Sequence, residues 1–460
     1  MSAISMLMQN IEETSFGTLP AEVVEATKKQ ILDTLGVVVA GTMSGNVRQV
    51  VELVKDWGGK GESTILGYGG KVPGPHAALV NGYSAVVLDY DDFHDLDIIH
   101  ASRAVLPACL ATAERLGAVQ GKDFILAVAL GFDLACRLSR SALVHLEFGF
   151  DMCVANPFGA AAGAGKLLGL DRKKLTNALG IALMQLGGAG SGVQEATSTK
   201  GLDGGLQAKV GVIAALMAER GLTAVSDPIE GNRGFYQAYH RTVYRPELLT
   251  LDLGKVFEGA TNSQKPYPCC RWIHTSIDAA LALVNEYDIQ PEEVEEVTVY
   301  IGPFLIQSAV HKGPLEIKQR PRNAIESQFS IPWAVANAIL YRKVGIENFT
   351  EEALRNTRTI EMARRVMSKA VIAAPTDFRT PESVTVEIKT KRDKVYSKRV
   401  DYALGSVANP MSFDDVAVKF KECCNHSVRP VALENREQVI RMVKHLEEVT
   451  DVSKIPGLLV

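Results

Sequence analysis

The chain has 460 residues, of which 47% are hydrophobic and 22% are charged, and its formal net charge is −4. This balance is typical of a globular protein, and the length suits two or three domains of ordinary size. A nucleic-acid-binding protein would carry a basic face, so the charge argues against that class of function.

Seven cysteines are present, an odd number that includes two adjacent pairs and no CxxC motif. This arrangement is a poor disulfide framework and favours reduced thiols in a cytoplasmic protein. The first twenty residues lack the basic start and apolar run of a secretory signal, and no apolar stretch reaches 18 residues. We therefore expect neither a signal peptide nor a membrane partner.

Residues 20–260 are predicted to be mainly helical. Between Pro20 and Gly41, apolar residues recur at helical spacing, at Val24, Ile31, Leu35 and Val38. Further helices are expected over residues 107–116 and 122–143, with a short connection over 117–121.

The segment 159–216 is unusually rich in Gly and Ala. Small side chains let helices approach closely, so tight helix packing is the expected role of most of them. A phosphate-binding loop is the weaker alternative, because no strand is predicted before these glycines and no Gly-Lys-Ser or Gly-Lys-Thr sequence ends the stretch.

The pattern changes near residue 265. Apolar and polar residues alternate over 297–301 and 384–388, and a turn over 391–394 leads to a further strand over 395–400. Helices are expected between these strands, over 331–341 and 351–367. The tail over 412–448 is helical again, with four predicted core contacts at Val416, Phe420, Val439 and Val443.

These patterns predict a mainly α protein with two domains. A large all-helical domain comprises residues 1–264 and 408–460, because the helical tail has little to bury itself against if it stands alone. A smaller α+β domain comprises residues 265–407.

The segment from Asp89 to His100 places five carboxylates and two imidazoles within twelve residues, between two apolar helical segments. Histidine titrates near neutral pH, and a neighbouring carboxylate can orient it and tune its pKa. The segment is therefore the first candidate for proton-transfer chemistry. Its ligand types also suit a metal, but we expect no metal site.

Three other polar clusters lie in surroundings of small or apolar residues, over 149–159, 195–205 and 265–274. The last of them falls on the predicted domain boundary, where small-molecule clefts commonly form. Together the four clusters predict one binding pocket.

The same segments resemble the motifs of the MmgE/PrpD family of dehydratases, decarboxylases and epimerases, and the resemblance covers nearly the whole chain. Residues 89–94 (DYDDFH) resemble the family's DFDDTH motif, and residues 100–107 (HASRAVLP) resemble its HPS…VLP motif. Residues 199–211 resemble TK…H.G.AA..G, and residues 265–274 (KPYPCCRWIH) resemble KpyPcCr..H.

The resemblance implies a cofactor-free lyase or isomerase that moves a proton next to a carboxylate of a small acid. It also implies a helical domain with a smaller lid, usually in a homodimer, and a site between the two domains. The positions that match the family's site are Asp89, Asp92, His100, Lys200, Lys265 and His274.

The residue types suit that chemistry. Removing a proton next to a carboxylate builds negative charge there, which Lys200 and Lys265 would stabilise, while His100 would act as general acid or base. Asp89 and Asp92 are predicted to orient the histidine or sustain its charged form; helix capping is the alternative.

Four further residues are candidates for substrate binding, each with a structural alternative: His94, Arg103, Arg271 and His274. His94 could face solvent, and Arg103 could form a surface ion pair. Arg271 could pair across the domain junction. The remaining acidic residues of the first segment, Asp91, Asp95 and Asp97, are expected to be solvated, and Cys269 and Cys270 to be packing elements.

The chain departs from the family pattern at two acidic positions. Asp151 and Asp203 stand where the family commonly has histidine, and we expect both to shape specificity. Two further departures are Phe93 in place of threonine and Trp333 in place of tyrosine. Because unpaired carboxylates repel one another and a substrate anion, the expected substrate has fewer carboxylates than citrate-like acids, or carries an amine or hydroxyl group.

The predicted function is a cofactor-independent lyase or isomerase that acts on a small carboxylic acid, with dehydratase chemistry narrowly ahead of epimerase or decarboxylase chemistry. A non-catalytic protein that binds a small acid is the competing class. The small acid and a second copy of the chain in a homodimer are the expected partners.

Overall fold

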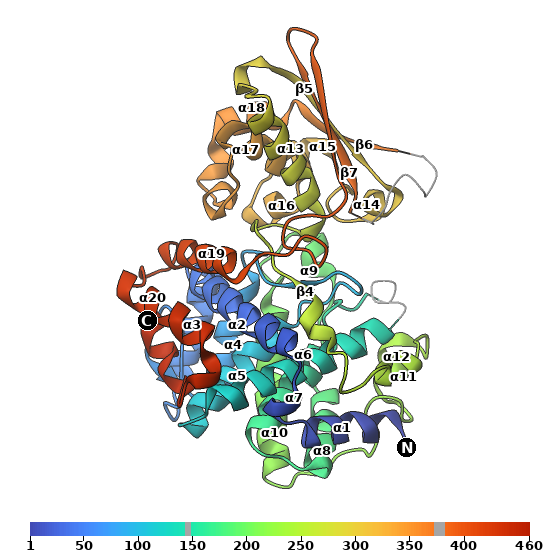
Figure 1. The fold of residues 1–460 in the computed structure, drawn as a ribbon, viewed down its shortest axis with the longest axis vertical. Coiled ribbons are helices and arrows are strands. Elements are labelled where there is room, and N and C mark those ends of the chain that lie inside the picture. The colour runs from blue at the N-terminus through green and yellow to red at the C-terminus, as the bar shows by residue number, and fades with distance from the viewer. Residues whose placement is uncertain (143–148, 372–381) are drawn as a thin grey trace.

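The computed structural model describes residues 1–142, 149–371 and 382–460. It is mainly helical, and Figure 1 shows a larger helical part beneath a smaller part that contains the main sheet. No helix of the described ranges combines the length and the apolar character that crossing a membrane requires.

The larger part is built from helices of the N-terminal half and two helices of the C-terminal tail. Figure 1 shows the tail helices packed beside the first helices of the chain. The bounds are α1 (Ala3–Glu13), α2 (Ala21–Gly41), α3 (Gly45–Trp57), α4 (Gly74–Val86), α5 (Ser102–Leu116), α6 (Gly121–Ser141), α7 (Asn156–Leu167), α8 (Arg172–Leu183), α9 (Ser191–Gln194), α10 (Leu202–Glu219), α11 (Phe235–His240), α12 (Glu247–Thr250), α19 (Phe413–Asn425) and α20 (Leu433–Lys444).

The smaller part contains a four-stranded sheet in the order β6-β5-β7-β8. β5 pairs in parallel with β6, whereas β5–β7 and β7–β8 are antiparallel. The strands are β5 (Val294–Ile301), β6 (Val366–Ala370), β7 (Val384–Thr390) and β8 (Val395–Val400), and the helices are α13 (His274–Glu286), α14 (Pro303–Gln307), α15 (Leu315–Gln319), α16 (Ala324–Gln328), α17 (Ile331–Tyr341) and α18 (Thr357–Ala363).

The predicted elements are confirmed in most places. The alternating valines and isoleucines of β5 and β7 are buried, and all four predicted core residues of the tail are fully buried. The helix predicted over 351–367 is wrong at both ends, because α18 covers only Thr357–Ala363 and residues 366–370 form β6, which pairs with β5. Leu143, the predicted end of α6, lies outside the described residues.

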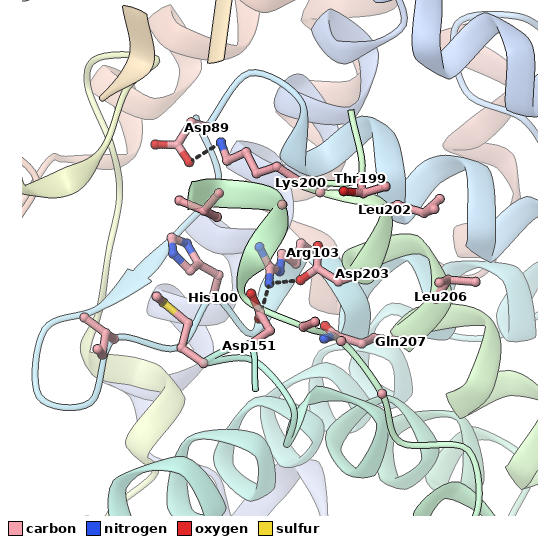
Figure 2. Close-up of a pocket in the computed structure, with 18 of the residues that line it drawn as sticks. Asp89, His100, Arg103, Asp151, Thr199, Lys200, Leu202, Asp203, Leu206 and Gln207 are labelled. Atoms are coloured by element: carbon pink, nitrogen blue, oxygen red, sulfur yellow. Dashed lines mark hydrogen bonds and ion pairs between the residues drawn. The ribbon is translucent and has the colours of Figure 1, made fainter. Parts of the chain in front are cut away.

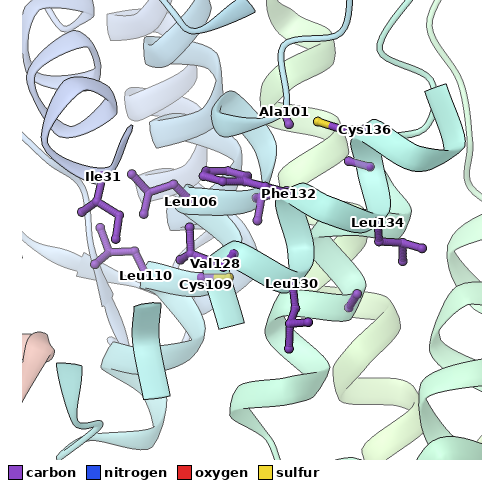
Figure 3. Close-up of a cluster of buried hydrophobic side chains, with 14 of the residues drawn as sticks. Ile31, Ala101, Leu106, Cys109, Leu110, Val128, Leu130, Phe132, Leu134 and Cys136 are labelled. Carbon is purple, nitrogen blue, oxygen red and sulfur yellow. The ribbon is translucent and has the colours of Figure 1, made fainter. Parts of the chain in front are cut away.

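Each part has its own hydrophobic cluster. One cluster draws on residues between Ile4 and Phe257 and again between Met411 and Leu459, and the other on residues between Tyr267 and Ile388. Figure 3 shows Leu106 and Leu110 of α5, Val128 and Phe132 of α6 and Ile31 of α2 in the first cluster. We propose domain boundaries at 264/265 and 407/408 on this basis.

Glycines allow the helices of the larger part to pack in close contact. A methyl group added at Gly159 of α7 would come within 2.5 Å of the main-chain oxygen of Gly131 of α6. One added at Gly211 of α10 would come within 2.3 Å of the side chain of Ala160. Tight helix packing, the expected role of these glycines, is confirmed at these contacts.

Two connections hold the acidic segment 89–100 in place. The two-residue strands β3 (Phe93–His94) and β4 (Asn262–Ser263) pair and bring the segment beside the chain that leads to Lys265. Beneath the segment, the buried Lys419 of α19 forms an ion pair with Asp33 of α2 at 2.7 Å and donates to the main-chain oxygen of Tyr90 at 2.9 Å. The other short strands, β1 (Ser63–Thr64) and β2 (Lys71–Val72), form a separate ladder.

Candidate active site

A cavity of about 660 Å³ lies where the two parts meet. Its wall includes Asp89, His100 and Arg103 of the larger part and Lys265 and Phe329 of the smaller part. Figure 2 shows the residues of the larger part that point toward this space. Such a volume suits a small-molecule ligand.

One side of the cavity holds two lysines that share a carboxylate. Lys200, which precedes α10, contacts Asp89 Oδ1 through its Nζ at 2.8 Å, and Lys265 Nζ lies 3.4 Å from Oδ2. Lys265 also donates to the main-chain oxygen of Asp89 at 2.9 Å. Asp89 has a φ of 51°, a left-handed conformation that Asp tolerates better than most residues.

The charges on this side fix the protonation of Asp89. Burial alone would raise the pKa of Asp89, but Lys200 and Lys265 outweigh that effect and hold its pKa well below the ordinary range. For Lys265, burial lowers the pKa, while Asp89 and Asp91 raise it to a net value above the ordinary one. This group therefore stays an ammonium–carboxylate cluster at neutral pH.

His100 lies two residues before the start of α5, and its imidazole is neutral at neutral pH. Its Nδ1 is 2.5 Å from the main-chain oxygen of Asp92, and because a carbonyl oxygen only accepts, Nδ1 carries the proton. The lone pair therefore remains on Nε2. Burial lowers the pKa of His100 to about 4, against the opposing charge of Asp91, whose carboxylate lies 3.4 Å from Nδ1.

Asp92 is buried behind the cavity wall and is not among the lining residues. Its carboxyl accepts hydrogen bonds from the Ser102 hydroxyl at 2.6 Å and from the Asn262 amide at 2.5 Å. Burial and the charge of Asp91 raise the pKa of Asp92 to about 7. Asp92 thus joins the acidic segment to the start of α5 and to β4, and its main-chain oxygen orients His100.

The other side of the cavity holds two carboxylates that share a guanidinium. Arg103 in the first turn of α5 contacts Asp203 of α10 and Asp151, the latter at 3.3 Å, through the same Nη2 atom. Figure 2 draws both contacts. Burial and the charge of Asp203 raise the pKa of Asp151, although Arg103 opposes them.

Three of the predicted substrate-binding residues do not join the Arg103 group. Two lie outside the cavity wall, and the third is held in ion pairs. His94 is fully buried, with Nδ1 2.7 Å from Asp97 and Nε2 3.2 Å from the Thr261 hydroxyl, and it does not line the cavity. His274 is also fully buried and outside the cavity wall; it donates through Nε2 to the Cys269 carbonyl at 3.1 Å. Arg271 lines the cavity, but its guanidinium pairs with Asp95 across the domain junction and with Glu382.

The expectation that Asp91, Asp95 and Asp97 are solvated is wrong. Asp91 and Asp97 are buried, and Asp95 is partly buried and paired with Arg271. Asp91 lies 3.6 Å from Lys265 and 3.9 Å from Arg103, in addition to its approach to His100. It therefore connects the two charged sides of the cavity beneath the wall.

Asp91, Asp92 and His100 bring three potential metal-ligand atoms within 4.8 Å of one another. The arrangement does not fit a metal well, because Nδ1 of His100 carries the proton that it donates to Asp92 and is closed to a cation. Lys265 and Arg103 already balance the charge of Asp91. Ion pairs of Asp91 and hydrogen bonds of Asp92 and His100 account for the cluster without a metal.

Sequence reasoning missed some wall residues. Gly187 and Gly188 line the cavity in a loop rather than packing a helix, and Gly188 has a φ of 120°. Gln207, one turn after Asp203 on α10, also lines it, with an amide nitrogen that has no partner among the described residues. The four-residue spacing of Asp203 and Gln207 was the available signal, since it puts both on one helix face.

The two adjacent cysteines are packing elements, as predicted. Cys269 is fully buried, and Cys270 lines the cavity at one edge. Burial raises the pKa of Cys270 to about 12 and that of Cys269 well above its ordinary value. Neither thiol ionises at neutral pH, so neither is a ready nucleophile.

Comparison with known proteins agrees with the motif resemblance. The chain is 26% identical to a cis-aconitate decarboxylase of Aspergillus terreus, over 96% of this chain and 92% of that protein. It is 27% identical to the cis-aconitate decarboxylases of Mus musculus (95% and 89% covered) and Homo sapiens (96% and 91% covered). The MmgE/PrpD N-terminal domain matches residues 6–245 and the MmgE/PrpD C-terminal domain matches residues 267–446. These matches cover most of the chain, which therefore belongs to the MmgE/PrpD family.

Proposed function

We propose that the protein is a lyase that acts on a small carboxylic acid by removing a proton from the carbon next to a carboxylate. The observation that carries this proposal is the neutral imidazole of His100 beside two lysines that share one carboxylate. That arrangement supplies a base and a surplus positive charge in one cavity. Family membership supports the assignment to small-acid lyase chemistry.

The proposed role of each residue follows from its charge. Lys200 and Lys265 receive the substrate carboxylate, and their ammonium groups stabilise the charge that develops on it as the proton leaves. His100 accepts the proton through Nε2, while its Nδ1–H remains fixed on the Asp92 carbonyl. Asp89 holds the two ammonium groups in position. None of these steps calls on a cofactor.

Among the reactions that begin this way, loss of water is our leading choice, with epimerisation and decarboxylation behind it. The relatives named above are cis-aconitate decarboxylases, which favours decarboxylation as the second candidate. Cis-aconitate, however, carries three carboxylates, and the guanidinium of Arg103, which lines the cavity with His100, is already shared by Asp151 and Asp203. We therefore propose a substrate with fewer carboxylates than citrate-like acids, or one with a hydroxyl or amino group at that end.

Proton exchange tests the proposal without knowledge of the full reaction. Wild type is incubated in deuterated water with malate, citramalate, 2-methylcitrate and cis-aconitate, and deuterium at the carbon next to a carboxylate is followed by nuclear magnetic resonance. We expect exchange or turnover with the smaller hydroxy acids and its loss in His100→Ala. Efficient turnover of 2-methylcitrate or cis-aconitate would contradict the proposal that the substrate has fewer carboxylates than citrate-like acids.

A protein that binds small acids without catalysis is the alternative of another class. The acidic residues at positions 151 and 203 motivate it, and the retained His100, Lys200 and Lys265 oppose it. Tight binding of an acid in a thermal-shift titration, with no exchange in that acid, would favour the binding protein.

We also propose that the protein works in the cytoplasm as a homodimer. All seven cysteines are free, which suits a reducing compartment. Sedimentation velocity at micromolar concentration tests the dimer, and cell fractionation tests the compartment.

A further inference from the structure

The charged group around Arg103 contains more carboxylates than cations. Asp151 Oδ1 and Asp203 Oδ2 approach the same Nη2 atom, so the two oxygens are no further apart than the sum of two short contacts. A third carboxylate, that of Asp91, lies 3.9 Å from Nη1 of this guanidinium. One positive charge therefore faces three negative charges within a buried region.

The surplus of negative charge remains when the neighbouring lysine cluster is counted with the Arg103 group. Three cations, Lys200, Lys265 and Arg103, are in contact with four carboxylates, Asp89, Asp91, Asp151 and Asp203. The surplus negative charge of this cluster opposes the approach of a carboxylate. One proton bound by one of the carboxylates would make the cluster neutral and remove that conflict.

The geometry assigns the proton to the pair at positions 151 and 203. Asp89 and Asp91 each contact a lysine, whereas Asp151 and Asp203 must divide one guanidinium. When two carboxyl groups are held this close, they do not both ionise readily, and one keeps its proton. The groups that face Asp151 are Asp203 of α10, Arg103 of α5 and the main-chain NH of Cys153, which donates at 2.8 Å.

We propose that Asp151 and Asp203 share one proton over Arg103, and that Asp151 donates it to the hydroxyl group that leaves the substrate. Asp151 would then be a second catalytic residue, distinct from His100. This role rests on the proposed function. The raised pKa of Asp151 and the lowered pKa of His100 agree with an acid and a base in one site.

Asp151 and His100 line the same cavity, which places both beside one bound substrate. Cys153 links them: its thiol lies 3.4 Å from the main-chain nitrogen of His100, and its own main-chain NH binds Asp151. Gln207, four residues after Asp203 on α10, lines the same cavity.

The step balances without a further reactant. Nε2 of His100 takes the proton next to the substrate carboxylate, and the electron pair of that C–H bond is first delocalised onto the carboxylate held by the lysines. It then forms the C=C bond as the neighbouring C–O bond breaks. The electron pair of the C–O bond goes to the hydroxyl oxygen, which takes the proton of Asp151 and leaves as water. His100 is then protonated and Asp151 ionised; His100 releases its proton to solvent and Asp151 takes one from solvent, which restores the starting state.

Infrared difference spectroscopy tests the shared proton without a substrate. The spectrum of wild type minus that of Asp151→Asn, recorded from pH 4 to pH 9, should contain one carboxylic-acid C=O band that disappears as the pH rises. In Asp203→Asn the band should titrate at lower pH, because the repelling charge is gone and Arg103 pairs fully with Asp151. Asp151→Glu should retain a titrating band, and the exposed control Asp123→Asn should match wild type. A difference spectrum with no titrating acid band overturns the proposal.

The donor role is tested with malate and citramalate. In Asp151→Asn, water loss should fall by about 10²–10⁴-fold, while His100-dependent exchange of deuterium into the substrate should persist. Equal loss of both would mean that Asp151 only maintains the site and would overturn the donor role. If wild type shows neither reaction but keeps the infrared band, the proposed function and the donor role fail while the shared proton stands.

Discussion

The two sides of the cavity are mirror images in charge. On one side two lysines share the carboxylate of Asp89, and on the other two carboxylates share the guanidinium of Arg103. The first side has a surplus of positive charge and can receive an anion, whereas the second has a surplus of negative charge and can hold a proton. His100 lies beside both, since Asp91 approaches its ring and also Lys265 and Arg103.

The difference shows how one cavity can separate two tasks of an elimination. Both sides are built from the same kinds of group, and only the ratio of cations to carboxylates differs. That ratio decides which protonation state is stable, because each unbalanced buried charge must be offset by a proton or a ligand. Substitutions that change the ratio of cations to carboxylates, or that remove His100, therefore test this difference.

Removing the base should have the largest effect on activity. His100→Ala should lower kcat/KM for the acid that wild type turns over by about 10²–10⁴-fold, since the general base is gone while both charged sides remain. Steady-state kinetics checks the loss, and near-ultraviolet circular dichroism checks the fold. The buried, off-wall His94→Gln serves as the matched control. An equal loss of activity in a well-folded His94→Gln would contradict the placement of the base at His100.

Removing a lysine should lower stability in addition to activity. Lys265→Met removes the cation that pairs with Asp91 and with Oδ2 of Asp89. Because both carboxylates stay buried, the loss of this partner should lower the free energy of unfolding by about 3–5 kcal/mol. Urea denaturation measures the change, with the exposed Lys312→Met as control. Adding Asp91→Asn to Lys265→Met should recover part of the loss. A cost below about 1 kcal/mol would mean that the ion pair contributes only as much as an exposed one.

Restoring the family's residue on the acidic side should change selectivity. Asp203→His removes one of the two carboxylates that contact Nη2 of Arg103, so an additional substrate carboxylate should bind better, by about tenfold or ~1.4 kcal/mol. Isothermal titration with citrate and malate measures the two affinities. The ratio should move toward citrate; an unchanged ratio would contradict the role of Asp203 in specificity.

Much of the fold follows from local patterns. The bounds of α17 and the buried face of α19 and α20 agree with helical periodicity, and β5 and β7 agree with alternation. β6 was mistaken for the end of a helix because its sequence, Val-Met-Ser-Lys-Ala, does not alternate, and its strand form depends on parallel pairing with β5. The paired residues of β5 and β6 are some seventy positions apart, so no local sequence pattern predicts the strand.

The site was predictable as a set of residues but not as a set of contacts. His94 and His100 lie six positions apart in one acidic segment, and only the pairing of β3 with β4 buries the first and leaves the second at the cavity. Likewise, the sequence marks Asp151 and Asp203 as unusual, yet their common partner Arg103 lies 48 and 100 residues away. Charge balance between such distant residues exists only in three dimensions.

The dependence of stability on pH should have opposite signs on the two sides. The pKa of Asp89 is lowered in the folded protein, so its contribution is present above the ordinary pKa of Asp and is lost as the pH falls through the folded value. The pKa of Asp151 is raised, so the folded state binds the extra proton and loses stability as the pH rises from about 4 toward neutrality. Urea denaturation from pH 3 to pH 8 should therefore show Asp151→Asn losing less stability than wild type over the upper part of this range, by on the order of 1 kcal/mol. Asp89→Asn should instead flatten the curve at its acid end. If both variants changed the same part of the curve in the same direction, the two sides would not differ in the way that their charges indicate.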